Sequence, residues 1–164
     1  MLVLGLDPGL ATTGYGIVRE SASGELSAVE YGTIVTSARQ ALPQRLLELD
    51  RQLGRLIVMH QPDVVAVEQM FFGRNVTTAL VVGQARGVAI LNAARAGLPV
   101  FEYKPVEVKQ AITGYGNAGK PQVQEMVRML LDLEQTPRPD DAADAAAVAI
   151  CHLHRAKLDA LARS

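Results

Sequence analysis

The pattern of hydrophobic and polar positions changes period along the chain, and each change marks an expected element. Leu2–Leu6 is a short apolar run closed by an Asp-Pro-Gly turn at residues 7–9, which predicts a buried strand. Two more strands are expected at Gly14–Arg19 and Leu26–Thr36. The short links between these three segments favour an antiparallel meander.

After this meander the period becomes that of helices alternating with strands. Leucines at three- and four-residue spacing predict a helix over Leu42–Leu56, and a compact apolar strand follows at Val64–Val67. The other expected elements are a long helix from Asn75 to Ala96, a strand at Val100–Phe101, two short helices beginning near Pro105 and Pro121, and a final alanine-rich helix from Pro139 to about Ala160.

This order of elements predicts an α/β fold with a five-stranded mixed sheet. The first three strands should be antiparallel, the last two parallel, and helices should flank the sheet. The chain has 164 residues, of which 49% are hydrophobic and 20% charged, so residues 1–164 are expected to form a single domain around one core.

Composition also indicates where the protein works. Cys151 is the single cysteine, so no internal disulfide can form. The N-terminal apolar run is short and lacks a basic leader, unlike a signal peptide. No apolar stretch is expected to approach the roughly 18 residues that span a bilayer. We therefore expect a soluble, cytoplasmic protein with no membrane partner.

Charge is unevenly distributed, although the net charge is only −1. Residues 71–130 contain seven basic and three acidic residues, a net charge of +4, which leaves −5 for the rest of the chain. A DNA enzyme that also binds cations needs this kind of separation, with a basic surface for phosphates and an acidic cluster for metal. Ordinary variation along a protein surface remains an equal alternative on charge alone.

Two acidic residues stand at the ends of buried strands. Asp7 follows the first strand, at the sheet edge where ligands commonly bind in open α/β folds. Glu68 follows Val64–Val67 and has no obvious helix to cap. Each has an ordinary explanation as well, because Asp-Pro-Gly makes a good turn unaided and Glu68 could be an exposed loop acid.

A second acidic pair opens the last helix. Asp141 and Asp144 are three residues apart, which places them about 60° apart on one helical face. Acids are favoured in a first helical turn, so helix capping is the alternative explanation. Asp140 complicates the assignment, because it is four residues before Asp144 and lies on the same face.

Together the four acids predict a metal-dependent hydrolase. Carboxylate oxygens suit Mg²⁺, which completes its octahedron with water and substrate phosphate oxygens. Two such ions about 4 Å apart can activate water on one side of phosphorus and stabilise the leaving oxygen on the other. The hypothesis requires Asp7, Glu68, Asp141 and Asp144 to converge.

Other motifs are weaker. Residues 114–120 combine a glycine pattern with a lysine, yet a helix is expected before them and Pro121 stands where a P-loop needs Ser or Thr. Lys120 could instead reach a DNA phosphate, or the loop could be a plain connector. Cys151, His152 and His154 lie within one helical turn without a second ligand pair, so a buried cysteine and helix-surface histidines are expected rather than zinc.

The segment after Glu68 offers candidate DNA contacts. Phe71 and Phe72 are adjacent aromatics in a loop, and one could stack on an unpaired base, with Arg74 near the backbone. Asn75 stands beside them and can also cap the long helix. Ordinary packing of the two phenylalanines is the alternative.

Four long stretches resemble the RuvC family of bacterial Holliday junction resolvases, which belongs to the RNase H-like (retroviral integrase) superfamily. They are GLDPGLATTGYGIV, VAVEQMFFGRNVTTALVVGQARGVAI, VFEY followed by VKQAITGYGNAGKPQVQEMV, and PDDAADAAAVAICH. The resemblance covers nearly the whole chain, and stretches of this length in this order are highly specific.

The resemblance implies a homodimer that nicks two opposing strands of a four-way DNA junction by metal-dependent hydrolysis, leaving 5′-phosphate and 3′-hydroxyl ends. It implies Mg²⁺, two ions per site with Mn²⁺ as a substitute, and the branch-migration proteins RuvA and RuvB as partners. Its D-A-A-D register selects Asp141 over Asp140. It also implies that Phe71 inserts at the junction and that Lys109 and Lys120 contact DNA near the scissile phosphate.

Dimer formation also has a physical basis, because a junction has near two-fold symmetry and two matched cuts need two identical sites. Small residues at Ala79, Gly83 and Gly87 could let the long helix pack against its dimer mate, or against the sheet.

Three other functions are considered. A different RNase H-like nuclease would share the metal chemistry and differ in substrate shape. A kinase-like ATPase domain also opens with an Asp-x-Gly turn but needs a second domain. A non-catalytic junction-binding module would have no use for the acid quartet.

Overall fold

The computed structural model describes residues 1–69 and 76–163. In these ranges the elements are, in chain order, β1 (Leu2–Asp7), β2 (Thr12–Glu20), β3 (Leu26–Val35), α1 (Leu42–His60), β4 (Val64–Glu68), α2 (Val76–Arg95), β5 (Val100–Tyr103), α3 (Pro105–Thr113), α4 (Lys120–Leu130) and α5 (Asp140–Arg163).

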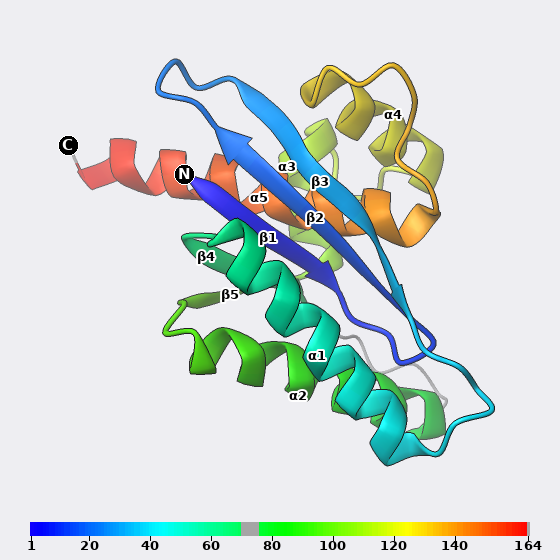
Figure 1. The fold of residues 1–164 in the computed structure, drawn as a ribbon. Coiled ribbons are helices and arrows are strands. Elements are labelled where there is room, and N and C mark those ends of the chain that lie inside the picture. Colours follow the sequence, from blue (N-terminus) through cyan, green and yellow to red (C-terminus); the bar gives the residue numbers. More distant parts are fainter. Residues whose placement is uncertain (70–75, 164) are drawn as a thin grey trace.

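The strands form one five-stranded mixed sheet, in the order β3-β2-β1-β4-β5 (Figure 1). β1 pairs antiparallel with β2, and β2 with β3, whereas β4 is parallel to both β1 and β5. The expected α/β fold, with an antiparallel meander followed by two parallel strands, is confirmed.

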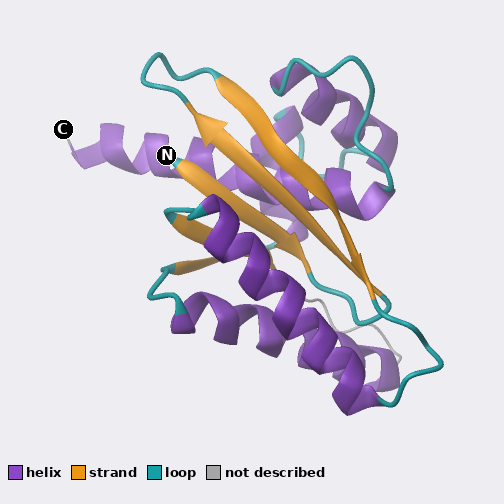
Figure 2. Cartoon of the chain, in the orientation of Figure 1, coloured by secondary structure: helices purple, strands orange, loops and turns teal. Residues whose placement is uncertain are grey.

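Helices cover both faces of this sheet (Figure 2). On one face, Leu4 and Leu6 of β1 pack in a cluster with residues of α1 and α2. On the other face, Val3 of β1 packs in a cluster with α3, α4 and α5. Because side chains alternate along a strand, the odd-numbered positions of β1, Asp7 included, face α5.

Strand β5 is longer than predicted, because it continues to Tyr103. The sequence pattern missed its second half because the charged Glu102, which is exposed on this edge strand, ends the apolar run Val100–Phe101. Glu102 forms an ion pair with Arg86 of α2 at 2.5 Å. The predicted helix cap Asn75 lies outside the described residues.

α5 lies unusually close to the sheet. Glycines on β1 and β2 face it, and a β-carbon at Gly14 would lie 2.0 Å from the carbonyl oxygen of Asp141. At Gly5 the corresponding distance to the carbonyl oxygen of Ala145 is 2.2 Å. Small residues on the helix match these glycines, because Ala142 and Ala146 are fully buried. The alanine-rich composition of this helix therefore serves close approach to β1 and β2.

Helix α2 carries apolar side chains at positions that are not buried as well as at those that are. Its buried residues are Ala85, Ala89, Asn92 and Ala93. By length and composition alone this helix could cross a membrane, so the expectation that no segment reaches that threshold is wrong for α2. One such helix is weak evidence for a span, because length and composition do not distinguish it from a helix that packs against protein.

Candidate active site

The two strand-end acids lie side by side at one end of the sheet. In the parallel pairing of β1 with β4, Leu6 lies opposite Val67, so the next residues along the two strands are Asp7 and Glu68. Both acids face α5 rather than α1, because Val3 and Ala66 pack in the α5 cluster at positions of the same parity. The register of two parallel strands therefore brings together acids that are 61 positions apart in the sequence.

The first turn of α5 reaches the same point. Burial, followed by the charges of Asp144 and Asp141, raises the pKa of Asp7 to about 6, opposed by Lys120. The charge of one carboxylate raises the pKa of another carboxyl group in this way only when the two are close. Asp7, Asp141 and Asp144 thus share one electrostatic environment.

Glu68 belongs to this environment too. Its pKa is raised to about 7, first by burial and then by the charges of Asp7 and Asp144. Lys109 and Lys120 oppose the shift, so both lysines lie within electrostatic range of Glu68. The structure brings together the four predicted acids and the two predicted lysines.

A pocket of about 220 Å³ lies between α3, α4 and α5 beside these groups. Its polar lining comes from Glu68, Lys109, Lys120 and Asp144. The Lys120 ammonium donates a hydrogen bond to Oδ2 of Asp144 at 2.9 Å. Two ammonium groups beside carboxylates give the pocket both anion-binding and cation-binding groups.

The donor set suits a hard divalent cation, although its side chains are not gathered into a ready-made cage. Among the described residues, no three Asp, Glu, His or Cys side chains are close enough to form a metal-binding group. Carboxylates repel one another without a cation, and here the Lys120 ammonium takes part of that compensating role at Asp144. The raised pKa values of Asp7 and Glu68 indicate that positive charge would stabilise the cluster.

Asp140 has different neighbours from Asp141. Its Oδ1 accepts a hydrogen bond from Arg138 at 2.5 Å, and its Oδ2 lies 3.4 Å from the Lys120 ammonium. The charge of Asp141, in contrast, raises the pKa of Asp7. This difference supports the choice of Asp141 as the third member of the quartet.

Four predicted DNA contacts lie outside the described residues: Phe71, Phe72, Arg74 and Asn75. They follow Glu68 in the chain and precede α2.

The weaker motifs have structural explanations. A helix, α3, precedes the glycine loop, and Pro121 stands in the first turn of α4, so the P-loop pattern lacks its strand. Cys151 is buried as expected. The expectation of a helix-surface position is wrong for His152, which is 4% exposed and hydrogen-bonded through Nδ1 to the Tyr103 hydroxyl at 2.7 Å. The polar Tyr103 partner on β5 makes that burial possible.

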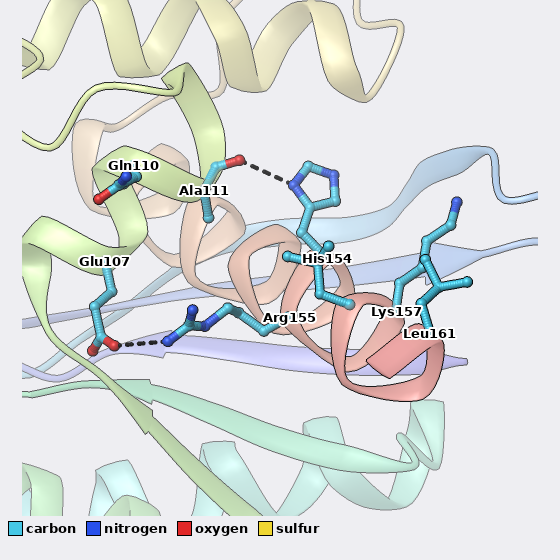
Figure 3. Close-up of a pocket in the computed structure, with 8 residues that line it drawn as sticks. Glu107, Gln110, Ala111, His154, Arg155, Lys157 and Leu161 are labelled. Atoms are coloured by element: carbon cyan, nitrogen blue, oxygen red, sulfur yellow. Dashed lines mark hydrogen bonds and ion pairs between the residues drawn. The ribbon is translucent and has the colours of Figure 1, made fainter. Parts of the chain in front are cut away.

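A larger pocket of about 610 Å³ lies between α3 and the C-terminal half of α5, away from the acids (Figure 3). Two of the polar contacts between these helices lie at this pocket. Arg155 pairs with Glu107 at 3.0 Å, and Nδ1 of His154 donates to the carbonyl oxygen of Ala111 at 3.0 Å. These contacts hold α3, and with it Lys109, against α5.

Sequence reasoning missed the glycines that position α5. Gly14 and Gly16 alternate on β2, and both face α5 where a β-carbon would collide with helix backbone. A glycine at every second strand position opposite an alanine-rich helix is a readable signal of close packing.

Comparison with known proteins agrees with this geometry. A family model described as "Crossover junction endodeoxyribonuclease RuvC" matches residues 3–152. The chain belongs to the RuvC family. The RuvC of Syntrophomonas wolfei, named a crossover junction endodeoxyribonuclease, is 55% identical over 164 residues, covering 100% of this chain and 95% of that one.

Solved RuvC structures share the fold over nearly the whole chain. Thermus thermophilus RuvC superposes with a TM-score of 0.91 at 35% identity, covering 97% of each chain. The same protein in complex with Holliday junction substrate gives a TM-score of 0.89 at 33% identity, covering 96% of each chain. The expected RNase H-like α/β fold is confirmed, and RuvC membership makes the chain an enzyme of the crossover junction endodeoxyribonuclease class.

Proposed function

We propose that this protein is a Holliday junction resolvase that acts in recombination and DNA repair. It hydrolyses phosphodiester bonds on two opposing strands of a four-way DNA junction and leaves 5′-phosphate and 3′-hydroxyl ends. The observation that carries the proposal is the convergence of Asp7, Glu68, Asp141 and Asp144 at one sheet end in a RuvC chain. The junction complex of the Thermus protein supports the choice of substrate.

The four acids act as ligands of Mg²⁺, two ions per site, with Mn²⁺ as a substitute. Bound ions of this kind supply an activated water and stabilise the leaving oxygen. The raised pKa values of Asp7 and Glu68 support this role, because a cation would replace the repulsion between their ionised forms by attraction.

The lysines beside the acids bind the substrate backbone. Lys109 and Lys120 line the 220 Å³ pocket together with Glu68 and Asp144. Their ammonium groups offset the negative charge of the acids and attract a phosphate to them. This arrangement orients the scissile bond at the carboxylates.

Phe71 and its neighbours supply contacts to the junction beyond the scissile phosphate. Phe71 inserts at the junction, and Phe72, Arg74 and Asn75 contact DNA beside it. The argument rests on chain order, because Phe71 is only three positions after Glu68.

The protein acts as a homodimer that associates through α2. One face of this helix carries small or exposed residues: Leu80, Gly83, Gly87 and Leu91. A β-carbon at Gly83 or Gly87 would meet nothing within 4 Å, so these glycines face away from the chain's own core. Leu80 is 64% exposed, which is costly unless a partner covers it. A second copy of α2 would bury this face and supply the second site that paired nicking requires.

RuvA and RuvB complete the proposed pathway as branch-migration partners, and the cytoplasm is the proposed location. Membership of the RuvC family supports the partners and the location.

The test is incubation of the protein with a synthetic four-way junction, a matched linear duplex and an RNA–DNA hybrid, each with Mg²⁺ or EDTA. Paired, ligatable nicks on the junction alone, abolished by EDTA, are expected. Cleavage of the hybrid instead would indicate a different RNase H-like nuclease. Junction binding without cutting under Mg²⁺ or Mn²⁺ would leave a binding module and return the acids to structural roles.

A further inference from the structure

Asp140 is not one of the proposed metal ligands. Each oxygen of its carboxylate lies near a different cationic side chain. Oδ1 accepts a hydrogen bond from Nη1 of Arg138 at 2.5 Å. Oδ2 lies 3.4 Å from Nζ of Lys120. Because Arg138 holds the first oxygen, the second is turned toward Lys120.

Lys120 stands where an ammonium group needs such compensation. It is the first residue of α4, and its side chain reaches the first turn of α5, so two helix N-termini with their partial positive charges lie near it. Its pKa is nevertheless raised, chiefly by the hydrogen bond to Asp144 and also by Asp140. The two acids, one turn apart on α5, therefore hold the ammonium between them.

The two contacts of Lys120 respond differently when a divalent cation binds at the proposed site. Asp144 is one of the proposed metal ligands, so a bound divalent cation competes with Lys120 for its oxygens and repels the ammonium. Asp140 points its oxygens at Arg138 and Lys120 instead, and the Gln124 side chain, followed by these two cations, lowers the pKa of its carboxyl group. Asp140 can therefore keep its contact with the Lys120 ammonium while Asp144 binds metal.

We propose that Asp140 is a positioning residue, which bridges Arg138 and Lys120 so that the Lys120 ammonium stays beside the acidic site while Asp144 binds metal. This inference rests on the proposed function. A lysine side chain has several freely rotating bonds, and without the bridge it would spend most of its time in solvent. Held at Asp140, it remains at the mouth of the pocket that Glu68 and Asp144 line, ready for a phosphate.

A helix-capping role is the competing explanation for Asp140, since an acid in the first turn of α5 stabilises that helix by itself. Such a role would change stability and leave the reactivity of Lys120 untouched. The decisive readout is therefore the Lys120 amine, measured separately from folding and from cleavage.

The experiment measures acetylation of Lys120 by mass spectrometry, because an ammonium group held by a carboxylate reacts more slowly. In EDTA, Asp144→Asn leaves Asp140 as the remaining acidic partner, so Lys120 should stay protected. Asp140→Asn added to Asp144→Asn should raise its rate about two- to fivefold, the range expected for one surface ion pair. In Mg²⁺, Asp140→Asn alone should raise the rate by a similar factor over wild type, and Asp140→Glu should restore protection.

Two controls accompany these variants. Lys157, an exposed lysine near the far end of α5, serves as the internal reference amine, and its rate should not change. Glu125→Gln removes an exposed acid from the same helix as Lys120, one that pairs with Arg128, and should leave Lys120 unchanged.

Equal Lys120 rates in Asp144→Asn and in the double variant, or equal rates in Mg²⁺ for wild type and Asp140→Asn, would overturn the inference. Junction cleavage by the wild type is measured on the same preparations. If the wild type cleaves, these results concern Asp140 alone. If it does not cleave, the proposed function fails first, and the inference falls with it.

Discussion

Gly14 of β2 and Asp141 of α5 are in such close contact that a β-carbon on the glycine would lie 2.0 Å from the carbonyl oxygen of the aspartate. The strand and the helix can approach this closely only because position 14 has no side chain. The contact sets the distance between the first turn of α5 and the end of β1, where Asp7 lies opposite Gly14. The close packing of α5 on β2 therefore also fixes the geometry of the acidic site.

Gly14→Ala should separate the acids and destabilise the protein. The added methyl group must displace helix backbone, and overpacking of this kind costs about 1–3 kcal/mol of unfolding free energy. Urea unfolding and junction cleavage measure the two effects. Gly119→Ala is the matched control for stability, since its β-carbon would meet Cδ of Pro121 at 3.8 Å, an ordinary contact. Full cleavage by a destabilised Gly14→Ala protein would show that the acidic site does not depend on this close packing.

Asp7→Asn should keep junction binding and lose cleavage. The substitution removes a charged metal ligand without changing side-chain shape, so we expect a fall in cleavage rate of at least about a hundredfold. Gel-shift and single-turnover cleavage assays measure the two properties. Asp159→Asn, an exposed substitution near the far end of α5, is the control. A folded Asp7→Asn protein that no longer binds junctions would contradict the prediction.

The metal-free protein should lose stability as the pH rises from about 4.5 to 7. The pKa of Glu68 is raised from 4.5 to about 7, so the folded state holds a proton that the unfolded state has already released. Folding is then opposed increasingly as pH passes through this window. Thermal unfolding in EDTA should show the decline, and Glu68→Gln should reduce it to the part that the raised pKa of Asp7 contributes. Added Mg²⁺ should stabilise more at pH 7.5 than at pH 5.5, because the metal competes with those protons. A Mg²⁺ effect independent of pH would argue against Glu68 as a ligand.

Leu80→Arg should dissociate the dimer while leaving the fold intact. The side chain is 64% exposed in one chain, so arginine is tolerated there, but a charge in a dimer interface is not. We expect the dimer dissociation constant to rise about thirtyfold or more. Sedimentation measures the assembly state. Val58→Arg on α1, at a position 76% exposed, is the matched control and should leave the assembly unchanged. A dimer that survives Leu80→Arg would place the interface elsewhere.

Phe71→Ala should weaken junction cutting more than folding. Loss of one aromatic stacking contact costs about 1–3 kcal/mol, which corresponds to roughly five- to more than a hundredfold in cleavage efficiency. Circular dichroism and cleavage of one junction preparation are compared. An unfolded Phe71→Ala protein would indicate instead that Phe71 belongs to the core.

The element order was readable from sequence because each element has its own period. Leucines over Leu42–Leu56 repeat at helical spacing, and the apolar run Val64–Val67 is too short for a helix. Acids that directly follow parallel strands can meet at one sheet edge, so the sequence supported a meeting of Asp7 and Glu68 as a hypothesis. That β1 and β4 are neighbours, which brings the two acids side by side, came from the structure.

Features that depend on partners across space were not readable in the same way. The closeness of α5 to Gly14 depends on which helix covers that face of β2, and the alanine composition alone does not say so. Asp140 could be assigned only from the positions of Arg138 and Lys120 on either side of it. Strand β5 was predicted too short because the polar Glu102 ends the apolar run after Phe101.

The last helix in chain order supplies two of the four acids, and it contacts all five strands as well as α3 and α4. During synthesis, β1 and β4 leave the ribosome with Asp7 and Glu68 long before Asp141 and Asp144 exist. A chain that stops before residue 141 lacks half of the proposed metal ligands. Premature termination or proteolysis at that point is therefore expected to yield a fragment that cannot cut DNA, rather than an unregulated nuclease.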